Sequence, residues 1–216
     1  MKALPENIQA EFYKVRYGDL SVAEFEKWVY ENADELEKYL EPNDYLDLIS
    51  LNFKQVHSKH ELMNLVDRTA AKPYGKDFGR YVVTQLLERL IAYEDDPIPL
   101  FKTLYDFYCH GFDFLGIGSL YYGYDLDELP SMKATHLWSE KESAQYRRRV
   151  DEAVGNAKPL AEKIIAAIDS GKIRINGFYN YEIDKETEEE LRRVNYDWPA
   201  SSLFAKPVKR WWKFWK

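Results

Sequence analysis

Residues 21–30, SVAEFEKWVY, carry the pattern that decides the fold class. Ser21 and Glu24 have the spacing of a capping box, in which a hydroxyl and a carboxylate reciprocally satisfy backbone N–H groups at a helix start. Val22 and Phe25 then begin an apolar face with the 3.6-residue period of an amphipathic helix. The stretch therefore predicts a helix that begins after Ser21 and buries one side.

The same start signal recurs at three further points: Ser58 with Glu61, Ser139 with Glu142, and Thr187 with Glu190. Before residue 72 we expect about five short helices, among them one led by Pro5 and others over 34–40 and 44–53. After it we expect a strong helix with apolar residues from 81 to 91. Further helices are expected over 99–110, 139–154 and 159–170.

Two segments in the second half differ in composition from these helices. Residues 112–130 combine glycines with Phe, Leu, Ile and Tyr, which favours strands or a long packed loop. Residues 172–183 alternate around Asn176-Gly177, which is a hairpin turn signal. We therefore expect a small β element near 112–124 and 172–183.

The fold class expected is mainly α: a compact multi-helix bundle with a small β-hairpin or sheet element in the C-terminal half. The Ala-Lys-Pro-Tyr-Gly stretch at 71–75 interrupts the helical pattern. It predicts a helical N-terminal subdomain over 1–72. Residues 73–216 would then form a helical body with the small β element and a basic Trp-rich tail.

Composition bounds the class of protein. The 216 residues are 45% hydrophobic and 16% aromatic with a net charge of −7, so wholesale disorder is excluded. No apolar run is long enough for a membrane span, and the first residues lack the apolar segment of a signal peptide. The single cysteine, Cys109, excludes an intramolecular disulfide. These features predict a cytoplasmic protein.

The sequence offers weak support for metal or nucleophile chemistry. His57 and His60 stand three residues apart across a helix start, whereas a zincin motif places two histidines four apart. Cys109 and His110 are adjacent, so their side chains diverge on a helix, and a buried inert thiol is expected at Cys109. We expect no catalytic residue and no metal.

A cofactor is not expected either. Residues 116–121, GIGSLY, begin like a dinucleotide fingerprint, but Tyr121 replaces the third glycine. A βαβ context before the motif is also lacking. The glycines there are expected to serve close packing or turns.

Acidic and aromatic residues predict a protein interface. Tyrosines beside carboxylates are typical of specific protein contacts, although the same tyrosines could pack inward and leave the acids as a solvated edge. The expected partner-binding strip consists of Tyr121, Tyr122, Tyr124, Asp125, Asp127 and Glu128. A second candidate surface consists of Glu94, Asp95 and Asp96.

Residues 206–216, KPVKRWWKFWK, form a basic tail with three tryptophans. Without its five basic residues the rest of the chain has 25 basic and 37 acidic side chains, a charge of −12. Such a tail could lie on a membrane surface or stack on single-stranded nucleic acid. Because the acidic body would repel both, we expect the tail to fold back on that body. Nucleic acid is not an expected partner, and membrane contact is not favoured.

Four stretches resemble immunity-type proteins, the small helical proteins encoded beside bacterial polymorphic toxins. They are residues 19–30, 44–53, 104–118 and 181–190. The resemblance implies a cytoplasmic protein that binds and blocks a cognate toxin and catalyses no reaction. Many such toxins are basic nucleases, so an acidic surface could occupy a phosphate site and accelerate encounter.

The expected function is therefore that of an acidic immunity protein that neutralises a cognate, basic toxin by occluding its active site. The alternative is a small-molecule-binding protein or enzyme with a pocket near residues 111–124. A structural or regulatory scaffold remains a third interpretation.

Overall fold

The computed structural model describes residues 3–17, 20–72, 77–94, 96–117, 135–177 and 180–196. These residues form nine α-helices, two 3₁₀ helices and one two-stranded antiparallel sheet near the C-terminal end. This arrangement confirms the mainly helical class with a small β element in the C-terminal half.

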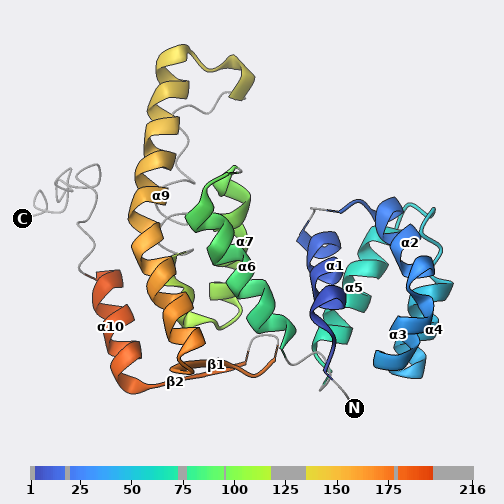
Figure 1. Ribbon diagram of the computed structural model, residues 1–216. Coiled ribbons are helices and arrows are strands. Elements are labelled where there is room, and N and C mark those ends of the chain that lie inside the picture. Colours follow the sequence, from blue (N-terminus) through green and yellow to red (C-terminus); the bar gives the residue numbers. More distant parts are fainter. Residues whose placement is uncertain are drawn as a thin grey trace, which may run out of the picture.

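Five helices precede residue 72, as expected: α1 (Glu6–Tyr17), α2 (Val22–Glu31), α3 (Ala33–Tyr39), α4 (Pro42–Ser50) and α5 (Ser58–Ala70). The later elements are α6 (Phe78–Ala92), α7 (Pro97–Cys109), η2 (Asp113–Leu115), η4 (Thr135–Leu137), α9 (Glu140–Asp169), β1 (Ile173–Ile175), β2 (Tyr181–Ile183) and α10 (Lys185–Tyr196). Figure 1 shows α1–α5 gathered on one side and the later helices with the hairpin on the other.

Helix α1 joins the two groups of elements. Its Tyr13 packs edge-on against Tyr81 of α6 at 6.0 Å between ring centroids, and its Tyr17 lies 6.3 Å from Phe107 of α7. The buried apolar residues of both groups belong to one continuous cluster. The expected division at residue 72 stays a prediction, and the contact surface of α1 is where the two groups meet.

Two of the four expected capping boxes form. Ser21 and Ser139 each accept a hydrogen bond from the backbone N–H three residues on, and Glu24 and Glu142 accept from the N–H of the cap residue. Both boxes lie on the exposed surface.

The other two boxes do not form, and in each case a nearby partner takes the hydroxyl. Ser58 is buried within the first turn of α5 and donates to the carbonyl of Phe53 at 2.9 Å, while α5 starts after His57. Thr187 lies inside α10, whose first turn is capped by the carboxylate of Asp184. Helices α5 and α10 therefore begin earlier than expected, and Ser58 and Thr187 lie inside their first turns and not at the cap position.

Helix α9 runs unbroken through Pro159, whereas two helices over 139–154 and 159–170 were expected. Proline removes one helical hydrogen bond, that to the carbonyl of Gly155. Gly155 and Pro159 are both exposed, so water can reach that carbonyl. Meanwhile the buried face continues across the proline through Val154, Ala157 and Ala161. Packing of this face against α6 sustains one 30-residue helix (Figure 1).

The expected β element at 112–124 is wrong for the part that the structure describes. Residues 113–115 form a 3₁₀ helix and 116–117 are helical. Phe112 is fully buried, stacked on Phe107 at 5.7 Å and edge-on to Tyr181 at 5.7 Å. These ring contacts hold the segment in a compact turn after α7. Residues 118–124 lie outside the described part of the chain.

The hairpin expected around Asn176-Gly177 is present. Ile173 pairs with Ile183 and Ile175 with Tyr181, so five residues connect the strands instead of two. The N–H of Asn176 donates to the carbonyl of Asn180 at 2.8 Å, and Gly177 has a φ of +143°, which favours glycine. The hairpin packs against α6 and α9.

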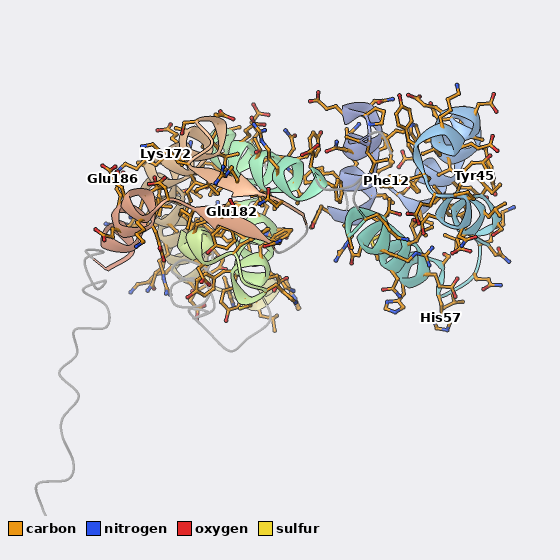
Figure 2. The ribbon with its side chains drawn as sticks, turned by 90° about the horizontal axis from the view of Figure 1, so that it is seen from below. Phe12, Tyr45, His57, Lys172, Glu182 and Glu186 are labelled. Atoms are coloured by element: carbon orange, nitrogen blue, oxygen red, sulfur yellow. The ribbon has the colours of Figure 1, made fainter. Side chains whose placement is uncertain are left out.

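The cap of α10 predicts a dependence of stability on acid. Asp184 accepts hydrogen bonds from the hydroxyl of Thr187 at 2.6 Å and from its N–H at 3.0 Å, and these bonds lower the pKa of Asp184. Lys172 adds a smaller electrostatic contribution and lies near the start of α10 (Figure 2). Because the folded-state pKa is below the unfolded one, the stabilisation is present above the unfolded pKa and is lost as pH falls.

We therefore expect Asp184→Asn to lower the thermal unfolding midpoint at about pH 6 and to lower it less at about pH 3. Asparagine keeps a capping oxygen but cannot ionise, so the comparison isolates the charge. Circular dichroism melts of both proteins at the two pH values measure the effect. A gap in midpoint that stays constant would contradict this account of the cap.

Candidate functional site at the α6–α7 corner

The structure describes only part of the interface expected from the sequence. The strip Tyr121, Tyr122, Tyr124, Asp125, Asp127 and Glu128 lies outside the described residues, as does Asp95. Glu94 and Asp96 are described, and both are exposed in the connection between α6 and α7. Of the second candidate surface, Glu94 and Asp96 therefore lie in the described part of the chain.

Tyr93, Glu94 and Asp96 lie where α6 is connected to α7, and we call them the α6–α7 corner. Tyr93 has a strained backbone conformation and is held by contacts with other residues. Tyr93 ends α6 in the left-handed region, with φ 51° and ψ 45°, and its N–H donates to the carbonyl of Arg89. Its hydroxyl donates to Asp151 of α9 at 2.6 Å, and Nζ of Lys158 lies 5.6 Å from the ring centroid. The hydrogen bond to Asp151 raises the pKa of Tyr93. Contacts with α9 thus fix the backbone that presents Glu94.

Asp96 is fixed by its role as a helix cap. Its Oδ1 accepts the N–H of Ile98 at 3.1 Å, and Pro97 occupies the first helical position of α7, where its missing N–H costs nothing. Oδ2 of Asp96 accepts no hydrogen bond from the described residues. The carboxylate is therefore held in place at the surface with one oxygen facing outward from the cap.

A pocket of about 300 Å³ opens beside this corner, between α1, α6 and α7. Its lining residues are Tyr17, Leu86, Arg89, Asp96, Pro99, Leu100 and Thr103. Nη1 of Arg89 donates to the hydroxyl of Tyr13 at 3.2 Å, which positions the guanidinium at the junction with α1. The lining is mixed: Leu86, Pro99 and Leu100 are apolar, and the other four residues bring polar groups.

Sequence reasoning missed this pocket. Its lining comes from three helices, and its polar members lie at positions 17, 89, 96 and 103. Only Asp96 had been singled out, because it belongs to an acidic run. Half of the segment of the alternative pocket, residues 118–124, lies outside the described part, so that expectation stays untested.

The segment that contains helices α2–α4 is strongly acidic. Residues 20–54 hold nine acidic and three basic side chains. Three of the five exposed large hydrophobic residues in the described chain lie in or after these helices: Tyr30, Leu46 and Val56. The Tyr30 ring, 52% exposed, packs edge-on against Phe53 at 6.3 Å. This surface would be expected to attract a basic partner at long range.

One acid within α4 has a structural role instead. Asp44 is only 3% exposed, and its Oδ1 lies 3.0 Å from Nε of Arg68 on α5. Lys72 reaches its other oxygen at 3.9 Å. Arg68 also pairs with Asp47 at 2.6 Å, a bond that raises the pKa of Arg68. The network ties α4 to α5.

The histidines and the cysteine show no assembled site. His57 and His60 are exposed, and Figure 2 shows His57 at the outer edge of the N-terminal group. Among the described residues, no three His, Cys, Asp or Glu side chains come together as a metal site would require. Cys109 is exposed at the end of α7, so the expectation of a buried thiol was wrong. The helix turns Cys109 outward, while Phe107 takes the buried position.

Two further expectations concern the basic tail and membrane-spanning helices. The tail at 206–216 lies outside the described residues, so its folding back stays a prediction. In the described part of the chain, no helix is both long enough and apolar enough to cross a membrane.

Comparison with known proteins gives no relative. No family model, no curated protein and no solved structure matches this chain.

Proposed function

We propose that the chain is an immunity protein that binds a cognate, basic toxin and occludes its active site. The observation that carries this proposal is the α6–α7 corner, where a partly exposed tyrosine and two exposed carboxylates are held on a fixed backbone. Tyr93 is 37% exposed, and Glu94 and Asp96 follow it. Aromatic residues supply binding energy at interfaces, and carboxylates select a basic partner.

The acidic helices α2–α4 support the same proposal through long-range electrostatic attraction. Their excess of carboxylates attracts a basic protein before contact, which accelerates association at low salt. The corner then supplies short-range contacts that set the lifetime of the complex. Fast capture is the property that an immunity protein needs, because free toxin harms the cell that makes it.

The biological test uses the genes that neighbour this one. If the function is immunity, an adjacent gene encodes a toxic domain, and its expression alone stops growth. Co-expression of this chain restores growth, and the two proteins co-purify. An adjacent product that is harmless, or toxicity that this chain leaves unchanged, would refute the proposal.

The interface prediction is kinetic. Glu94→Lys is expected to slow association with the toxin and weaken its dependence on salt, because it reverses a charge at the rim. Tyr93→Ala is expected to speed dissociation about tenfold or more, because it removes an aromatic anchor. Surface plasmon resonance at two salt concentrations measures both rates.

Glu186→Lys is the matched control, since it makes the same charge change on α10 (Figure 2). Tyr93→Phe keeps the ring but removes the bond to Asp151, and so separates packing at the interface from support of the corner. Equal slowing by Glu94→Lys and Glu186→Lys would show that only net charge matters and would remove the corner from the interface.

A further inference from the structure

We propose that Asn176 in the hairpin turn is a site of spontaneous deamidation, a covalent modification that loosens the hairpin from α6. This inference concerns the chemistry of one turn and does not depend on toxin binding. It rests on an exposed carboxamide, on the glycine amide that follows it, and on the close packing of that glycine against α6.

The two reacting groups are accessible to one another. Asn176 is exposed, and its carboxamide forms no hydrogen bond with another described residue. The bond that closes the turn uses the N–H of Asn176, which donates to the carbonyl of Asn180, so it does not engage the N–H of Gly177. Glycine has no side chain that would hinder the approach of its nitrogen to the carboxamide. The sequence holds no other Asn-Gly pair.

The reaction needs only the chain, a base and water. The nitrogen of Gly177 loses its proton to the base and attacks Cγ of Asn176, which closes a succinimide ring. The bond between Cγ and Nδ2 breaks, and Nδ2 takes up a proton and leaves as ammonia. Water then opens the ring at one of its two carbonyls. Opening at Cγ gives aspartate, whereas opening at the backbone carbonyl of residue 176 gives isoaspartate.

The isoaspartate product does not fit the packing of the hairpin. Its main chain runs through Cβ and Cγ, so the path from Ile175 to Gly177 is longer by one methylene group. The carbonyl of Gly177 lies so close to α6 that a Cβ on Gly79 would stand 2.5 Å from its oxygen. Ile175 is 6% exposed and belongs to the buried core. A longer turn cannot satisfy both contacts, because a packed interface tolerates little change of length or volume.

The test is prolonged incubation of the full chain at mildly alkaline pH, followed by peptide mapping with mass spectrometry. We expect residue 176 to gain one mass unit, since OH replaces NH₂, and to elute as both aspartate and isoaspartate. The rate should rise with pH, because the attacking species is the deprotonated amide. Asn180 is the internal control: it is exposed in the same turn, but Tyr181 follows it and hinders the same attack. An intact Asn176, or equal conversion of Asn180, would overturn the proposal.

Variants separate the longer main chain from the added charge. Freshly purified Asn176→Asp carries the charge of the product on an unchanged backbone, and Asn176→Gln, whose ring closure is slower, controls for general ageing. We expect amide hydrogen exchange in β1 to be about tenfold faster or more in the charge-shifted fraction of the incubated parent than in Asn176→Asp. Incubated Asn176→Gln should exchange like the fresh parent. Equal exchange in the modified fraction and in Asn176→Asp would refute the loosening of the hairpin.

Discussion

Gly79→Ala is expected to lower the free energy of unfolding by about 2 kcal/mol, although alanine is the better helix former. Gly79 lies in the first turn of α6, where the hairpin packs against the helix. A Cβ atom there would lie 2.5 Å from the carbonyl oxygen of Gly177 and 3.3 Å from Cγ2 of Ile175. Backbone oxygen cannot rotate aside, so the hairpin has to move away from α6.

The chain provides its own control for this substitution. Gly155 lies inside α9, is exposed, and has open space where a Cβ would stand. Gly155→Ala should therefore stabilise the protein by about 0.5–1 kcal/mol, the ordinary gain of alanine over glycine in a helix. Urea denaturation of the two variants and the parent measures both. A gain in stability at Gly79 comparable to that at Gly155 would show that the hairpin does not pack there.

Helix content was predictable because each helix is encoded by a local period, but helix ends were decided by neighbours. The Ser-x-x-Glu pattern occurs at both Ser21 and Ser58, yet only Ser21 caps a helix. The hydroxyl of Ser58 is taken by the carbonyl of Phe53, a contact that depends on how the chain turns after α4. A local pattern cannot distinguish these two outcomes.

Pro159 is a helix stop signal that does not end the helix, so here too a local pattern does not fix the helix end. Proline is a valid stop signal, but its cost is about 3 kcal/mol, and a long buried face can exceed that. Ala157, Leu160 and Ala161 continue the face of α9 across the proline. The apolar period continues across Pro159 in the sequence, and burial of that face outweighs the single proline.

The candidate site was predictable only in part. Acidic runs are visible in a sequence, so Glu94 and Asp96 were found. The pocket beside them requires Tyr17 of α1 to meet Arg89 of α6, a contact set by the packing of α1 across both groups of helices. No local pattern in the sequence encodes that meeting.

Arg68→Met is expected to cost about 2–3 kcal/mol, because it removes the guanidinium that lies 3.0 Å from the buried carboxylate of Asp44. Asp44 is 3% exposed, and Nζ of Lys72 lies 3.9 Å from its other oxygen. The expected cost is below that of a fully buried pair, since the Arg68 side chain is 47% exposed and solvent screens part of the interaction. Methionine keeps much of the stem that covers α4.

A double-mutant cycle separates this pair from packing. Asp44→Asn removes the charge and leaves the hydrogen-bonding shape, so it should cost about 1 kcal/mol. If loss of the ion pair between Asp44 and Arg68 causes the cost of Arg68→Met, the double variant should be less destabilised than the two single costs added together. Arg68 also holds Asp47 on the exposed side of α4, and Asp47→Asn in the Arg68→Met background should change little. Strictly additive costs for Asp44 and Arg68 would instead mean that α4 is attached to α5 by apolar packing alone.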